Sequence, residues 1–296
     1  MSRFILGCAS FGNVYSELDF QTCLQLVRHA LANHINHFDT SPFYGKSQEI
    51  LGKIISQLVR EGFEPAQFII STKIGRYGEN DFDFSYSKCL ESVSKSLKVF
   101  DRKYLDIVFC HDIEFAPNLD DIFQITLPTL HQLKLEGKIK KIGISGLPLS
   151  VLDYIITKSQ IQIDVVLTYC SYTLNYSQLD NYIDKWKQKG CQIIHGGVTA
   201  LGLLTKQGPP SWHPADEKTK KLCQQIAKKY DNITEIAYNY VDNNSKIDHI
   251  MIGPSNLKEF YEYLTWQELK LDPTLVDKVK KLFVDNYIWQ ETNVEI

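Results

Sequence analysis

Short apolar runs alternate with longer amphipathic segments along this chain. Eight such runs stand out, each only long enough for a buried strand of a parallel sheet. They span residues 5–9, 36–39, 68–73, 104–111, 141–145, 164–169, 192–195 and 249–253. Between them, segments such as 19–32, 85–100 and 119–135 place apolar residues at helical spacing. The pattern predicts repeated βα units.

Eight βα units in about 250 residues favour a closed (β/α)8 TIM barrel, and a doubly wound open sheet is the main alternative. No GxGxxG follows the first run, which argues against the open sheet. Gly137 follows a basic helical turn and precedes the fifth run closely, so we expect it to end that helix in the left-handed conformation. Without a composition break, residues 1–296 are predicted to form a single domain.

The composition points to a small-molecule partner. A net charge of -3 without a long basic run gives no electrostatic reason to bind nucleic acid or an anionic membrane. No apolar run approaches the roughly 20 residues of a membrane span. The seven cysteines lie far apart without metal-binding spacing, so we expect no metal site and reduced thiols in the cytoplasm. We expect a monomer or a weak dimer.

Four titratable residues follow the predicted strands at the end where barrel enzymes carry their active sites. HFDTSPFYG supplies Asp39 and Tyr44, IISTKIG supplies Lys73, and IVFCHD supplies His111. Taken singly, each has a structural explanation: a turn cap, a loop aromatic, or a structural ion pair or hydrogen bond. Together they favour catalysis, because a lysine ending an apolar strand needs a facing carboxylate, and Asp39 is available on the neighbouring strand.

A tyrosine beside such a lysine suits proton transfer. A phenol has an ordinary pKa near 10 and needs an adjacent positive charge to ionise near neutral pH. Lys73 supplies that charge in this prediction, Tyr44 exchanges the proton on a substrate oxygen, and His111 donates a hydrogen bond that fixes the substrate. A cofactor would carry the hydride.

FDTSPFYG, STK and FCHD resemble, in order, the catalytic tetrad of the aldo-keto reductase superfamily. The stretches GCASFGNVY, TKIGRY, FCHDIEF, IGISGLPL and LGLLTKQGPPSWHPA are most similar to L-galactose dehydrogenases and related NAD-linked aldose 1-dehydrogenases. The resemblance covers nearly the whole chain. It implies a (β/α)8 barrel that lacks the N-terminal hairpin of many relatives, because the first strand starts almost at Met1.

The resemblance also implies a set of cofactor-binding residues. It assigns Ser145 and Thr168 to the nicotinamide carboxamide, and Gly253 and Ser255 to the adenosine end. The set is Ser145, Thr168, Thr199, Leu201, Gly253, Ser255 and Glu259. NADP-preferring relatives carry a lysine and an arginine where this chain has Pro254 and Glu259. A carboxylate there repels a 2′-phosphate and accepts from a ribose hydroxyl, so we expect NAD as the cofactor, although Lys258 is a neighbouring positive charge.

Several positions depart from the family pattern. Gly146 stands where relatives often have Asn, Thr168 where they have Gln, and Gly196 where a tyrosine stacks on the nicotinamide. The Ser-Pro-Leu of relatives is replaced by residues 197–199. Tyr169 or Tyr172 are candidates for the missing stacking aromatic. A plain loop at Gly196 and the following glycine remains the alternative.

Three aromatic residues in predicted βα loops are candidate sugar contacts: Tyr15, Tyr77 and Trp212. Exposed loop aromatics also occur without any ligand.

Function follows from the tetrad and the resemblance. We expect NAD-dependent oxidation of an aldose at C1, with L-galactose as the leading substrate and a role in ascorbate-type synthesis or a sugar-acid route. One alternative is an NADPH-dependent aldehyde or ketone reductase, since the tetrad serves both directions. The other is a non-catalytic nucleotide-sensing regulatory barrel, against which the intact tetrad argues.

Overall fold

The computed structural model describes residues 3–13 and 18–283. Its eight strands form one closed parallel barrel in which each strand pairs with the next, and β8 returns to β1. The strands are β1 (Phe4–Gly7), β2 (His37–Asp39), β3 (Ile69–Ile74), β4 (Leu105–His111), β5 (Ile139–Ser145), β6 (Val165–Tyr169), β7 (Gln192–Gly196) and β8 (His249–Ile252). All eight predicted strands are confirmed, with ends that differ by at most two residues.

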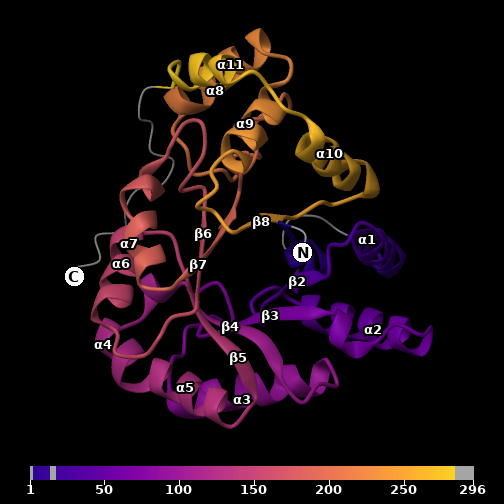
Figure 1. Cartoon of the computed structure of the whole chain (residues 1–296), viewed down its shortest axis with the longest axis vertical. Helices are drawn as coiled ribbons and strands as arrows, with labels where there is room; N and C mark the ends of the chain where they lie inside the picture. The colour runs from indigo at the N-terminus through magenta and orange to yellow at the C-terminus, as the bar shows by residue number, and fades with distance from the viewer. Residues whose placement is uncertain (1–2, 14–17, 284–296) are drawn as a thin grey trace.

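Helices surround the barrel and follow one another around it in approximate chain order, from α1 near β2 to α10 near β8 (Figure 1). They are α1 (Phe20–Ala32), α2 (Ser47–Arg60), α3 (Tyr86–Val99), α4 (Leu119–Asp121), α5 (Leu127–Leu135), α6 (Leu149–Lys158), α7 (Ile183–Gln188), α8 (Glu217–Lys229), α9 (Ile233–Asp242), α10 (Leu257–Glu268) and α11 (Pro273–Lys280). The predicted (β/α)8 TIM barrel is therefore confirmed.

The segment predicted as one helix over 119–135 contains a π-helical turn. Residues Ile122–Thr126 are π-helical between α4 and α5, and Pro128, which cannot donate a backbone hydrogen bond, follows in the first turn of α5. The predicted helix end at Gly137 is confirmed: its φ is 71°, and the Gly137 N–H donates to the carbonyl of Lys134.

Side chains alternate between the inside of the barrel and the helical layer, as strand geometry requires. The interior holds a small apolar cluster of Ile5, Ile107, Phe109, Val165, Leu167 and Ile194. A much larger apolar core lies between the strands and the helices. Polar side chains occupy the inward positions at both ends of several strands, and those at the carboxyl ends form the candidate site.

All seven cysteines lie in the described part of the chain, are buried, and form no disulfide with one another. Among the described residues, no cluster of side chains is arranged to hold a metal ion, and no helix has the length and apolar character needed to cross a membrane.

Candidate active site

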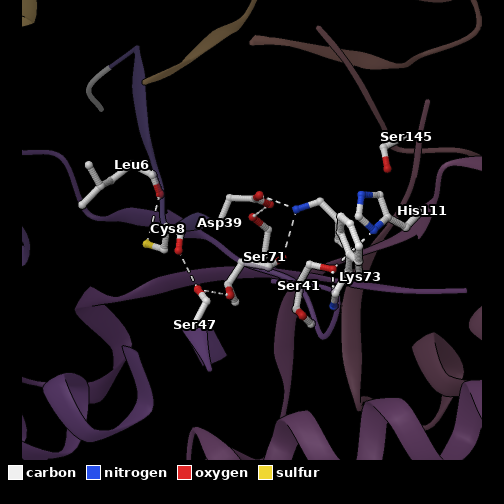
Figure 2. A network of polar contacts seen from close by, with 12 residues as sticks. Leu6, Cys8, Asp39, Ser41, Ser47, Ser71, Lys73, His111 and Ser145 are labelled. Atoms are coloured by element: carbon white, nitrogen blue, oxygen red, sulfur yellow. Dashed lines mark hydrogen bonds and ion pairs between the residues drawn. The ribbon is translucent and has the colours of Figure 1, made fainter. Parts of the chain in front are cut away.

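Asp39 and Lys73 form a buried ion pair at the carboxyl ends of β2 and β3, each with 1% of its side chain exposed. The Lys73 ammonium also donates to the carbonyl of Thr40 at 3.0 Å, and the Ser71 hydroxyl donates to the second Asp39 oxygen at 2.7 Å. Figure 2 shows Asp39 and Lys73 facing each other with Ser71 beneath the carboxylate. The lysine is therefore not an isolated buried charge, because the Asp39 carboxylate and the Thr40 carbonyl both accept hydrogen bonds from its ammonium.

Tyr44 lies against this pair from the loop between β2 and α2. The Lys73 Nζ is 4.8 Å from the centroid of the Tyr44 ring. The ring of His111 meets Tyr44 edge to face, with centroids 5.9 Å apart and an interplanar angle of 88°. The four residues, which come from three different strands and the loop after β2, therefore meet at one end of the barrel.

Two glycines hold the Tyr44 loop in place. Gly12 ends a short 3-10 helix, η1 (Ala9–Gly12), and a Cβ on it would lie 1.6 Å from the Tyr44 carbonyl oxygen. Gly45 has a φ of 53°, which favours glycine, and its Cβ position lies 2.7 Å from the Gly12 carbonyl oxygen. The chain after β1 therefore contacts the backbone of the tyrosine directly, and only glycine permits that approach.

His111 ends β4 with 5% of its surface exposed. Its Nδ1 lies 3.3 Å from the Ser41 hydroxyl, and its Nε2 lies 3.5 Å from the Asp112 carboxylate. Burial lowers the pKa of His111 to about 3; Lys73 and Arg76 act in the same direction, while Asp112 opposes them. The imidazole is therefore neutral near pH 7, and its single N–H can donate to only one partner.

A cationic and aromatic rim borders His111, and motif analysis did not identify it. Arg76 Nη1 lies 2.6 Å from the Asp112 carboxylate, and the guanidinium lies 3.9 Å from the centroid of the Phe43 ring. Phe82 and Phe115 stack on each other with centroids 4.9 Å apart and lie near the same guanidinium. The sequence did offer a positional signal, because Arg76 and Asp112 lie within two residues of the ends of β3 and β4, which carry Lys73 and His111.

Ser145 ends β5 in register with His111. Its side chain is buried, and its hydroxyl lies 3.5 Å from the carbonyl of Cys110. Figure 2 shows Ser145 beside the His111 ring at the barrel mouth. Ser145 therefore lies at the barrel mouth beside His111, and its contact with a nicotinamide carboxamide stays a prediction.

Thr168 requires a correction. Val165 and Leu167 of β6 belong to the cluster inside the barrel, so the alternation of the strand directs Thr168 outward, toward the helices. Its hydroxyl is fully buried. The same alternation directs Tyr169 to the interior side of the mouth, where it pairs in register with Gly196. Of these two residues, Tyr169 rather than Thr168 therefore lies on the side of β6 that faces the site.

Glycines stand at the carboxyl ends of β7 and β8, so the backbone there carries no side chain. A Cβ on Gly196 would come no closer than 3.6 Å to any neighbour, and a Cβ on Gly253 no closer than 3.9 Å. At Gly196, where the resemblance expects a stacking tyrosine, only backbone therefore lies beside Tyr169. Tyr172, the other candidate for stacking, is already stacked on Tyr240 with centroids 4.7 Å apart.

Glu259 organises the loop between β8 and α10. Its carboxylate accepts from the backbone N–H of Ser255 at 2.8 Å, from the Ser255 hydroxyl, and from the Asn256 amide at 2.9 Å. The Asn256 side chain in turn accepts from the Glu259 N–H and caps α10. The donors of the predicted adenosine loop are therefore already engaged by a carboxylate.

The loop after β7 holds Thr199 and Leu201. The carbonyl of Thr199 accepts from the N–H groups of Gly202 and Leu204, which closes a turn. Ala200 and Leu201 both have positive φ, near 50°, a conformation that side chains rarely adopt and that occurs often at functional sites.

The three predicted sugar contacts have different surroundings. Tyr15 lies outside the described residues. Tyr77 accepts from the Gly75 N–H at 3.3 Å, and Lys88 of α3 lies 4.9 Å from its ring centroid, so it packs between its own loop and α3. Trp212 is 56% exposed, and its ring is stacked with the ring of His213.

The comparisons agree with this geometry. Residues 3–283 match the model of the aldo/keto reductase family. L-galactose dehydrogenase of Arabidopsis thaliana is 36% identical over 96% of this chain and 91% of its own length. D-arabinose 1-dehydrogenase of Saccharomyces cerevisiae is 30% identical over 77% of this chain and 70% of its own length.

The fold also matches that of a solved aldo-keto reductase, AKR11C1 from Bacillus halodurans in its holo form. The TM-score is 0.80 at 20% sequence identity, over 99% of this chain and 95% of that one. This chain belongs to the aldo/keto reductase family of oxidoreductases.

Proposed function

We propose that this protein is an NAD-dependent aldose 1-dehydrogenase that oxidises a sugar such as L-galactose to its lactone. The observation that carries the proposal is the position of Lys73, whose ammonium is held by Asp39 and lies 4.8 Å from the centroid of the Tyr44 ring. The similarity to two enzymes named as sugar dehydrogenases supports the substrate class.

Each tetrad residue has a distinct role in this proposal. Tyr44, as the phenolate, takes the proton of the C1 hydroxyl while the C1–H bond breaks and a C=O bond forms. Lys73 stabilises the phenolate, and Asp39 orients Lys73. His111 is neutral and donates a hydrogen bond to the sugar oxygen. A bound nicotinamide supplies the acceptor for the hydride.

The rim beside His111 suits a sugar. The Arg76 guanidinium lies over the Phe43 ring, and Arg76 and Asp112 carry a donor and an acceptor for hydroxyl groups. Both charged groups already pair with each other, so they are held in place before a ligand arrives.

The preference for NAD rests on Glu259. The Ser255 and Asn256 donors that a 2′-phosphate would need are hydrogen-bonded to the Glu259 carboxylate. A phosphate at this loop would have to displace a like charge, while a ribose hydroxyl can donate to it.

The test measures NADH or NADPH formation by absorbance with purified protein, offering L-galactose, D-arabinose and L-fucose. We expect activity with NAD, and loss of that activity in Tyr44→Phe. Tyr86→Phe is the matched control, because Tyr86 is 49% exposed on α3. If no sugar is oxidised with either cofactor although the protein binds NADH, the proposed activity is wrong.

A further inference from the structure

A line of polar side chains continues from the tetrad into the barrel interior. Asp39 binds Lys73 through one oxygen and accepts from the Ser71 hydroxyl through the other, at 2.7 Å. The Nε2 of His37 lies 3.1 Å from the same hydroxyl. Ser71 is fully buried and His37 is 7% exposed. The line therefore runs from the mouth to the first residue of β2, at the opposite end of that strand.

Chemistry fixes the direction of these hydrogen bonds. Ser71 has one hydroxyl hydrogen, and a carboxylate can only accept, so that hydrogen is used on Asp39. Toward His37 the hydroxyl can then only accept. The His37 Nε2 must carry the proton, and every donor in the line points toward the Asp39 carboxylate.

The surroundings of His37 keep it neutral. Burial lowers its pKa to about 3, and the charges of His249, Lys141 and Lys73 act in the same direction. The ring of His249 on β8 lies 6.3 Å from that of His37, between centroids. Because His37 has a single N–H, donation to Ser71 leaves Nδ1 without a proton.

We propose that Ser71 and His37 are positioning residues for the Asp39–Lys73 pair. The Ser71 hydroxyl takes one carboxylate oxygen and so fixes the other against the Lys73 ammonium. It also stabilises part of the carboxylate charge, which leaves more of the Lys73 charge available to Tyr44. His37 acts only through Ser71, by holding the hydroxyl in its donating orientation. The kinetic part of this inference rests on the proposed function.

The kinetic test compares Ser71→Ala, His37→Leu and His37→Gln with the unchanged protein. Ser71→Ala should lower kcat by roughly 10-fold, the scale of losing one hydrogen bond to a charged group, with KM unchanged. His37→Leu should lower kcat in the same way but by no more than Ser71→Ala, because His37 acts through Ser71. Their pH profiles should move to higher pH by roughly one unit, since Asp39 then neutralises Lys73 more fully. His37→Gln retains an amide donor and should recover most of kcat.

The double variant separates positioning from a general structural effect. If His37 acts through Ser71, His37→Leu should have little further effect in the Ser71→Ala background. Independent, multiplying losses in kcat, or unchanged pH profiles, would overturn the proposal.

A measurement without substrate keeps the two proposals distinguishable. In ¹⁵N NMR of the full protein, the His37 ring, assigned by comparison with His37→Gln, should show the Nε2–H form. Ser71→Ala should shift the His37 signals. A proton on Nδ1 of His37 would refute the hydrogen-bond chain from His37 through Ser71 to Asp39, even if the enzyme oxidises sugars. Inactivity on all sugars would refute only the proposed activity and would leave the NMR result valid.

Discussion

The ammonium of Lys73 lies 4.8 Å from the centroid of the Tyr44 ring, while its own hydrogen bonds go to Asp39 and the Thr40 carbonyl. Asp39 and the Thr40 carbonyl therefore fix the position of the ammonium, and its positive charge lies next to the ring of Tyr44. We therefore expect activity and stability to depend on the same buried group.

Replacing Lys73 should separate these two contributions. We expect Lys73→Met to lower kcat by about 10²- to 10⁴-fold, the range for lost general acid–base catalysis. It should also lower the free energy of unfolding by about 3–5 kcal/mol, because Asp39 is left buried without its cation. Chemical denaturation and steady-state kinetics measure the two effects. The double variant with Asp39→Asn should regain part of the stability but none of the activity. Near-normal kcat in Lys73→Met would contradict the assigned role.

Gly12→Ala should displace Tyr44 without altering any catalytic group. Its Cβ would lie 1.6 Å from the Tyr44 carbonyl oxygen, so the loop must move, and displacements near 1 Å cost about 100-fold in rate. We expect a loss in kcat with NADH affinity largely retained, measured by fluorescence titration. Gly62→Ala is the control, since nothing lies within 4 Å of its Cβ and its positive φ carries only a local strain. Equal kinetics in both variants would refute the steric coupling.

Glu259→Gln should weaken the preference for NAD. A glutamine preserves the capping arrangement of α10 but removes the charge that a 2′-phosphate would meet. We expect the ratio of kcat/KM for NAD to that for NADP to fall by about 10-fold or more. Glu262→Gln removes the same charge one turn along α10, where Glu262 lies 3.9 Å from Lys258, and should leave the ratio nearly unchanged. An unaltered ratio in Glu259→Gln would show that another group selects the cofactor.

Glu114 should make the protein less stable as the pH rises. Burial and the charge of Asp112 raise the pKa of its carboxyl from an ordinary 4.5 to about 8. One oxygen accepts from the Leu147 N–H at 3.1 Å, and the other is buried without a hydrogen bond. Because the folded protein holds this proton more tightly, its stabilising effect is complete below the unfolded pKa and is lost as pH rises through about 8.

Thermal unfolding between about pH 5 and about pH 9 measures this dependence. We expect the Tm of the unchanged protein to fall over this interval and that of Glu114→Gln to fall less. Parallel curves would mean that Glu114 titrates normally.

The sequence alone predicted the architecture and the four residues that meet at the barrel mouth. Eight apolar runs with helical segments between them define the strands of a parallel barrel, whose carboxyl ends must share one rim. Asp39, Lys73 and His111 each end a strand, so their convergence follows from the order of elements. The Asp39–Lys73 pairing also follows, because a lysine at that depth requires a neighbouring carboxylate.

Only the tertiary structure decided which side chains contact these residues. A shift of one position along a strand reverses the direction of a side chain, and for this reason Tyr169 faces the mouth while Thr168 faces the helices. The contacts of Ser71 with His37, and of Arg76 with Asp112, join elements whose register and loop paths no local pattern encodes. Side-chain periodicity indicates which face of a strand is buried. Which residues of neighbouring strands contact each other depends on the shift in register between the strands of the closed barrel.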